Sequence, residues 1–227
     1  MLARILPFAA YVAFLAITQT IPSWPVTFGN RDWQDQVALW SYPVKTAVVL
    51  ILLIYFRHQY DELRRRPLLD RTQAALSLGI GLIVYAFWVR LDWSWAVQGE
   101  GGEARGYNPF MVPGAAGLAL AGIRLFGASA VVPVMEELFW RSFLLRYVIS
   151  SKFESIPLGM FTPFSFGITV VLFGFEHDLW LAGMVAGAAY NGLLYYTKRL
   201  WSCVLAHGTT NLALGIHVLA TGEWQWW

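Results

Sequence analysis

The chain carries little charge for its length. Only 13% of its 227 residues are Asp, Glu, Lys or Arg, against roughly 25% in globular proteins, and 57% are hydrophobic. The formal net charge is only +2, and the arginines stand in short loops instead of forming a basic face, which argues against a nucleic-acid partner. With a mean hydropathy of +0.51 and twelve tryptophans, the composition indicates an integral membrane protein.

Cysteine is almost absent as well. The single Cys203 cannot form an intrachain disulfide, and a lone cysteine in an apolar helix is usually a small packed residue and not a nucleophile. The sequence also lacks an internal repeat, a low-complexity segment and a long linker. We therefore expect residues 1–227 to form a single integral membrane domain in which Cys203 is buried.

What the chain does contain is a series of apolar runs separated by short polar loops. The first run begins behind Arg4 and shows no small-x-small cleavage pattern before Pro22, so we interpret it as an uncleaved span. This pattern predicts an all-α, polytopic membrane protein with about seven or eight transmembrane helices around an intramembrane polar cavity. The runs are residues 2–21, 39–56, 74–95, 110–149, 164–176, 179–196 and 200–220.

The loops predict the orientation. The densest positive cluster is the loop 57–71, which contains Arg57, Arg64, Arg65, Arg66 and Arg71. The positive-inside rule places this loop, and with it the N-terminus, in the cytoplasm, as expected for a multi-pass protein of the cell inner (cytoplasmic) membrane. Lys45, within the second run, is expected to extend toward the outer surface.

The run 110–149 is too long for one straight span. Forty helical residues measure roughly 60 Å, whereas the hydrocarbon core is ~30 Å thick. A break or kink is expected at one of four positions, which are Gly114, Gly117, Arg124 and Pro133. Glu136 follows the proline closely, and a kink there can admit water beside the acid.

The same run contains two acids and a base, Glu136, Glu137 and Arg141. A charge in mid-membrane costs about 2.5–3.5 kcal/mol on insertion scales, so these groups need partners or a water-filled cavity, and an intramembrane site is the leading hypothesis. The alternative is a structural ion pair between Glu137 and Arg141, which stand one helical turn apart and can hold neighbouring helices together.

Two further polar groups belong to apolar runs: His177, at the end of one run with Phe173 four residues before it, and His207, inside the last run with Asn211 four residues after it. Together with the carboxylates they suit hydrolysis, in which a glutamate and a histidine activate water, and a histidine and an amide stabilise the oxyanion. His58, in a hydrophilic loop, and His217, near the outer end of the last run, receive no role in the site.

Metal-dependent hydrolysis is the competing chemistry. Two histidines and a glutamate form a common catalytic zinc set, although the chain has no His-Glu-x-x-His helix. The sequence also has no serine or cysteine in a recognisable nucleophile motif. We expect no cofactor, with zinc as the alternative.

Three short motifs in the chain resemble, in their order, the three-motif signature of the CAAX prenyl endopeptidase family, also called the CPBP or Abi family. They are Glu136-Glu137-x-x-x-Arg141, Phe173-x-x-x-His177 and His207-x-x-x-Asn211. All seven positions match, over about a third of the chain. The resemblance implies an eight-helix intramembrane endopeptidase with a motif-bearing core at about 110–220 and a conical cavity open toward the cytoplasm.

Carried over by position, the resemblance implies that Glu136 and His177 activate the hydrolytic water without a metal. His207 and Asn211 would form the oxyanion hole. Glu137 would assist, Arg141 would orient the glutamates, and Phe173 would support the site, as the motif positions require.

The first half of the chain, with its Trp-rich outer loops, is most similar to bacterial CAAX-protease-related proteins associated with exosortase and PEP-CTERM sorting systems. This similarity implies a membrane-anchored protein or peptide substrate in the lipid bilayer and makes sorting-system components candidate partners. Two other functions stay open, a non-catalytic scaffold or immunity-type protein and a proton-coupled transporter, although the chain lacks the inverted repeats of many transporters.

Overall fold

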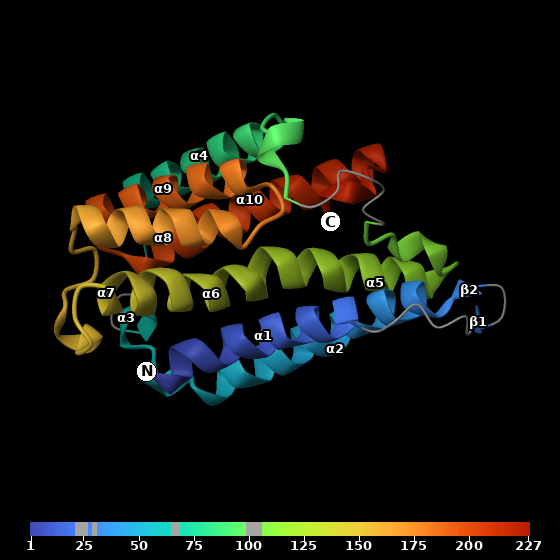
Figure 1. Ribbon diagram of the computed structural model, residues 1–227, viewed down its shortest axis with the longest axis horizontal. Coiled ribbons are helices and arrows are strands. Elements are labelled where there is room, and N and C mark those ends of the chain that lie inside the picture. Colours follow the sequence, from blue (N-terminus) through green and yellow to red (C-terminus); the bar gives the residue numbers. More distant parts are fainter. Residues whose placement is uncertain (21–26, 29–30, 65–68, 99–105) are drawn as a thin grey trace.

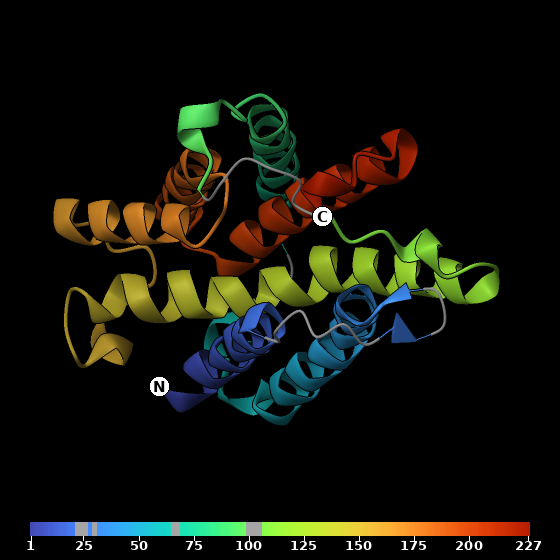
Figure 2. The ribbon, with the colours of Figure 1, turned by 45° about the vertical axis from the view of Figure 1, so that its right-hand side comes forward.

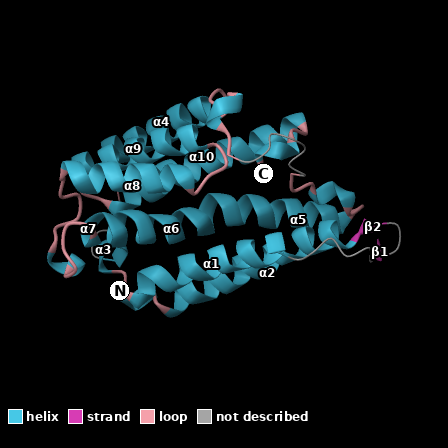
Figure 3. Cartoon of the chain, viewed as in Figure 1, coloured by secondary structure: helices cyan, strands magenta, loops and turns pink. Residues whose placement is uncertain are grey.

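The computed structural model describes residues 1–20, 27–28, 31–64, 69–98 and 106–227. Its elements are mainly helices, and a short antiparallel pair joins β1 (Thr27–Phe28) to β2 (Arg31–Asp32) (Figure 3). The prediction of an all-α protein is confirmed. The α-helices are α1 (Leu2–Thr20), α2 (Trp33–Tyr55), α3 (Asp61–Arg64), α4 (Arg71–Trp88), α5 (Ala115–Phe126), α6 (Val132–Glu137), α7 (Leu145–Tyr147), α8 (Pro163–Phe175), α9 (Trp180–Thr197) and α10 (Leu200–Thr221).

One long helix forms the centre of the fold. Helices α5, α6 and α7 run on without a break over Ala115–Tyr147, 33 residues or about 50 Å. Two π-helical segments, Gly127–Val131 and Leu138–Leu144, interrupt the α-helical hydrogen bonding. In Figures 1 and 2 this helix lies between α1 and α2 on one side and α4, α8, α9 and α10 on the other.

The expected break in this helix is only partly confirmed. The helix begins after Gly114, whose φ of 73° suits glycine. Gly117 and Arg124 lie inside α5, so the prediction of a break at either residue was wrong. Pro133 falls at the start of α6, directly after the π-helical segment Gly127–Val131, where the α-helical hydrogen bonding is already interrupted. The chain stays helical past the proline.

The outer surface of the bundle is apolar, as a lipid-facing surface requires. Ile51, Leu118 and Phe164 are 64%, 66% and 69% exposed. Among the described residues, two helices, Ala115–Tyr147 and Leu200–Thr221, are long and apolar enough to cross a bilayer. Shorter apolar helices cover Leu2–Thr18, Leu39–Tyr55 and Pro163–Phe175. The chain is therefore an all-α membrane protein.

The two ends of the bundle differ in chemistry. At one end, which we call the basic end, Arg4 contacts Glu62 at 2.8 Å, and Arg146 lies 3.5 Å from the same carboxylate. Its described cations are Arg4, Arg57, Arg64, Arg71, Arg146, Lys152, Lys198 and Arg199, and two arginines of the expected cluster, Arg65 and Arg66, lie outside the described residues. At the other end, the aromatic end, are Trp88, Trp93, Trp95, Trp180, Trp224, Trp226 and Trp227.

Two predictions about single side chains have opposite outcomes. Cys203 is fully buried, as expected. Lys45 is only 6% exposed, so the prediction that it extends to the outer surface was wrong. Its ammonium lies 4.0 Å from the centre of the Tyr11 ring and 5.0 Å from that of Tyr42. Cation–π contact with these two rings, from α1 and α2, compensates the charge inside the bundle.

Gly81 brings α4 against α10, and its replacement tests this contact. A Cβ at Gly81 would clash with the Ala206 carbonyl oxygen and lie 2.7 Å from Thr209 Cβ. We expect Gly81→Ala to lower the free energy of unfolding by about 1–3 kcal/mol through overpacking. Thermal unfolding of the purified protein in detergent measures the effect. Gly79→Ala is the matched control, since a Cβ at Gly79 meets no atom within 4 Å, and equal destabilisation by both would contradict the prediction.

Candidate active site

The two adjacent glutamates of α6 have different surroundings. Glu137 is fully buried, and its Oε1 accepts a hydrogen bond from Arg141 at 3.1 Å. Glu136, on the neighbouring face of the helix, is 5% exposed and lines a cavity. Its Oε2 is buried and has no hydrogen-bond partner among the described residues. One carboxylate is therefore occupied by an ion pair and the other is available to a ligand.

Arg141 joins three helical elements around this ion pair. Its guanidinium lies 4.3 Å from the centre of the Phe173 ring on α8 and 5.3 Å from that of Tyr190 on α9. It also donates to the carbonyl oxygen of Gly187 at 3.4 Å. A planar guanidinium can pair with a carboxylate while stacking on rings. The structural ion pair considered from the sequence is therefore present.

His207 lies beside both carboxylates. Its Nδ1 is 2.9 Å from Glu137 Oε1, and its Nε2 is 3.9 Å from Glu136 Oε2. The imidazole stacks on the Tyr190 ring, with 5.2 Å between centres and 23° between planes. Since Nδ1 faces a carboxylate oxygen, it donates the hydrogen, and Nε2 points toward Glu136. This contact fixes the ring orientation of His207.

His177 follows the end of α8, one turn after Phe173. Its Nδ1 lies 2.8 Å from the Phe173 carbonyl oxygen, which can only accept, so Nδ1 carries the hydrogen. The Nε2 of the neutral ring therefore keeps its lone pair. Gly183 of α9 packs closely here, because a Cβ on it would lie 3.3 Å from His177 Nδ1. The ring also makes an edge contact with Trp88, at 5.2 Å between centres.

Asn211 is held by the long helix. Its Nδ2 donates to the carbonyl oxygen of Ala128 at 2.9 Å. Ala128 belongs to the π-helical segment Gly127–Val131, and such segments are common at functional sites. An amide nitrogen has two hydrogens, so the second one remains for another acceptor.

These side chains meet in one cavity of about 200 Å³. Glu136, His177, His207 and Asn211 all line it, and Glu137 and Arg141 lie behind its wall. The complete lining is Tyr11, Tyr42, Trp88, Arg124, Ala128, Val132, Glu136, Phe173, His177, Ala186, Tyr190, His207, Thr210, Asn211, Leu214, Trp226 and Trp227. The structure thus brings the three sequence motifs together, with polar groups converging in an apolar wall.

The two other histidines are outside this cavity, as expected from the sequence. His58 is exposed in the loop after α2. His217 is bound elsewhere, with its Nδ1 2.9 Å from the Tyr85 hydroxyl and its Nε2 3.0 Å from Glu223.

Sequence reasoning missed Tyr190, which packs against both His207 and Arg141. Its hydroxyl donates to Thr210 Oγ1 at 2.7 Å, and Thr210 in turn donates to the Gly81 carbonyl oxygen at 2.8 Å. This chain of bonds connects α9, α10 and α4 behind the site. The signal available in the sequence was the polar pair Tyr190-Asn191 in the middle of an apolar helix.

Among the described residues, no group of three or more His, Cys, Asp or Glu side chains is placed to hold a metal ion. The Nδ1 atoms of His177 and His207 already have partners within the protein, and so does Glu137. The expectation of a metal-free site stays a prediction.

Comparison with known proteins identifies a domain within the chain. Residues 118–213 match the family model described as type II CAAX prenyl endopeptidase Rce1-like. The segment includes all seven motif positions, so the resemblance found in the sequence is confirmed, and the chain carries a domain of this membrane protease family. The exosortase-associated subgroup stays a prediction. Searches of curated proteins and of solved structures found no match.

The buried ion pair predicts a large stability effect. Arg141→Met leaves the buried Glu137 without its cation, so we expect the free energy of unfolding to fall by about 3–5 kcal/mol. Adding Glu137→Gln should restore part of the loss, because the uncompensated charge is removed. Chemical denaturation in detergent micelles measures both variants. An Arg141→Met protein as stable as the wild type would show that the pair does not stabilise the fold.

Proposed function

We propose that the chain hydrolyses a peptide bond of a membrane-anchored protein or peptide with a water activated by Glu136 and His177. The single observation that supports this most is the cavity that Glu136, His177, His207 and Asn211 share within an apolar helix bundle. Membrane proteases need water, a base and an oxyanion site at one point, and these side chains supply the base and the donors.

Glu136 is the general base in this proposal. Its carboxylate lines the cavity, where it can accept a hydrogen bond from the attacking water and then take its proton. His177 assists through Nε2, whose lone pair is left available because Nδ1 is bound to the Phe173 carbonyl oxygen. The proton that Glu136 takes from water is then passed to the leaving amine.

His207 and Asn211 stabilise the oxyanion of the tetrahedral intermediate. Asn211 contributes the Nδ2 hydrogen that is not bound to Ala128. His207 contributes Nε2 when that atom is protonated, and its Nδ1 contact with Glu137 keeps the ring aimed at the reacting centre. Glu137 and Arg141 thus act as positioning residues.

The distribution of charge supports an orientation. The described cations of the basic end are concentrated in the loops around α3, α7 and the start of α10. By the positive-inside rule this end faces the cytoplasm, which also places the N-terminus there. The chain is then a multi-pass protein of the cytoplasmic membrane.

A scaffold is the second candidate function. The ion pair of Glu137 and Arg141, with its contacts to Phe173, Tyr190 and His207, would hold the helices together even without catalysis. Glu136 distinguishes the two functions, because it lines the cavity and its buried Oε2 makes no hydrogen bond among the described residues, so its carboxylate contributes little to holding the helices together.

Glu136→Gln tests the base directly. The amide keeps the shape of the side chain but cannot take a proton, so we expect the kcat for cleavage of a membrane-anchored peptide library to fall about 10²–10⁴-fold with folded yield unchanged. Glu223→Gln is the control, since Glu223 lies after α10 and pairs with His217 outside the cavity.

Each preparation would also be assayed for zinc. Lost cleavage at normal yield without bound zinc supports the glutamate-activated water. Stoichiometric zinc that disappears in Glu136→Gln would replace this mechanism by metal-dependent hydrolysis. Wild-type protein without activity on any library member, together with a poorly folded variant, would favour the scaffold.

Single-cysteine labelling tests the orientation. Cys203 is buried and should not react, so exposed serines can be replaced one at a time: Ser151 after α7, at the basic end, and Ser94 at the aromatic end. In right-side-out vesicles we expect a membrane-impermeant maleimide to label Ser94→Cys at once and Ser151→Cys only after permeabilisation. The reverse pattern would invert the proposed topology.

A further inference from the structure

The catalytic cavity leads toward the aromatic end. On the long helix its lining residues recur every four positions from Glu136 back to Arg124. On α10 and the following residues the lining continues from His207 through Leu214 to Trp227. Because these two helices run in opposite directions, both rows of residues lead to the same end of the bundle.

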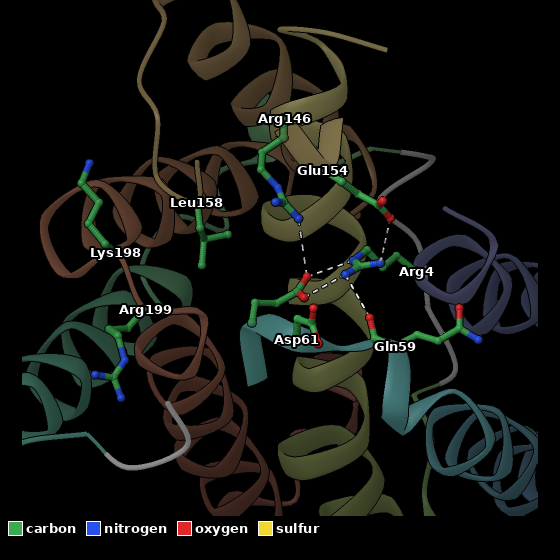
Figure 4. Close-up of a pocket in the computed structure, with 9 residues that line it drawn as sticks. Arg4, Gln59, Asp61, Arg146, Glu154, Leu158, Lys198 and Arg199 are labelled. Atoms are coloured by element: carbon green, nitrogen blue, oxygen red, sulfur yellow. Dashed lines mark hydrogen bonds and ion pairs between the residues drawn. The ribbon is translucent and has the colours of Figure 1, made fainter. Parts of the chain in front are cut away.

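The basic end has a separate pocket of about 460 Å³ (Figure 4), and the two pockets share no lining residue. Its inner cations are paired with acids, because Arg4 lies beside Glu62 and Glu154, and Arg146 lies beside Glu62. In the proposed orientation the catalytic cavity therefore faces the extracytoplasmic side. This differs from the cytoplasmic opening that the family resemblance implied.

Arg124 lies at the aromatic end of this cavity in an unusual environment. Its guanidinium is 4.2 Å from the centre of the Tyr42 ring, 5.2 Å from that of Tyr107 and 5.9 Å from that of Trp227. Within the part of the chain that the structure describes, no carboxylate forms an ion pair with Arg124, and its Nε is buried without a hydrogen-bond partner.

The charge near this position is also positive. The ammonium of Lys45 contacts the same Tyr42 ring, at 5.0 Å from its centre. Two cations sharing one ring, with no described acid paired to Arg124, favour an anionic ligand. A guanidinium binds a carboxylate through two parallel hydrogen bonds, and these are stronger where aromatic side chains take the place of water around the pair.

Building on the proposed protease function, we propose that Arg124 is a specificity residue that binds a carboxylate of the substrate at the aromatic end of the cavity. Twelve residues of helix separate it from Glu136, which is roughly 18 Å. An extended peptide covers that distance with about five residues at ~3.3 Å each. The scissile bond then lies about five residues from the bound carboxylate, which is either a C-terminal α-carboxylate or an Asp or Glu side chain.

Binding of synthetic peptides to the purified full-length protein tests the subsite without requiring cleavage. Three N-acylated hexapeptides would be compared by calorimetry in detergent: a peptide with a free C-terminal acid, its carboxamide, and the same carboxamide with its last residue replaced by Glu. We expect the free acid to bind wild type about 10- to 100-fold more tightly than the amide, as a charged hydrogen-bonded pair implies. The Glu-bearing amide identifies a side-chain carboxylate as the ligand if it binds equally tightly.

Arg124→Met should abolish this preference, and Arg124→Lys, which keeps the charge but not the two-pronged geometry, should retain part of it. Arg90→Met is the matched control, because Arg90 is exposed at the same end and does not line the cavity. In cleavage assays with acid-bearing library peptides, Arg124→Met should raise KM and leave kcat nearly unchanged.

Equal binding of acid and amide by the wild type would overturn the subsite, and this outcome does not depend on how any variant folds. A preference for the acid that survives in Arg124→Met would also overturn the subsite. So would displacement of the bound acid peptide by phosphatidylglycerol but not by small carboxylates, because this result would assign the site to a lipid headgroup. If acid and amide bind equally while library peptides are still cleaved, the subsite fails and the protease function stands. Acid preference without cleavage would contradict the protease function instead.

Discussion

The buried ion pair between Glu137 and Arg141 is the constraint on which the rest of the site depends. Two opposite charges inside an apolar bundle need further contacts besides the ion pair itself. Arg141 also contacts the Gly187 carbonyl oxygen and two aromatic rings, and Glu137 also contacts His207. The Oε2 of Glu137 and the Nε of Arg141 have no hydrogen-bond partner among the described residues. The contacts of the pair connect the long helix to α8, α9 and α10. The same contacts leave Glu136, on the next face, facing the cavity.

The π-helical segments explain how one helix can serve both as a span and as a site. In a π turn the hydrogen bonds run to the fifth residue, which shifts the side-chain faces relative to an α-helix. One segment presents the Ala128 carbonyl oxygen to Asn211, and the other contains Arg141. The chain therefore places polar groups without ending the helix, and an end in the bilayer would expose unpaired backbone groups to lipid.

The sequence predicted the helices because they depend on local periodicity, and the three motifs stood out because their polar side chains interrupt apolar runs. Apolar runs give the spans, and a spacing of four places His207 with Asn211 on one face. The missed features depend on contacts between distant segments. Lys45 is buried because rings from α1 and α2 surround it, and Tyr190 supports the site through residues of other helices. The direction of the cavity likewise follows from how α10 packs on the long helix, which local patterns do not specify.

The size of the cavity limits the form in which a substrate can reach Glu136. At about 200 Å³ it is smaller than ordinary ligand pockets of ~300–1,000 Å³, and an α-helix with its side chains is ~10 Å wide. A transmembrane helix does not fit as a helix. In the proposed function such a substrate must unwind locally, and an extended segment would expose the peptide carbonyl to the attacking water. The polar atoms of Asn211 and His207 can then replace hydrogen bonds that the unwound backbone loses in the membrane. The choice of the peptide bond that is cleaved would thus depend first on how easily the substrate helix unwinds around it. Helical segments rich in glycine or proline should unwind most readily.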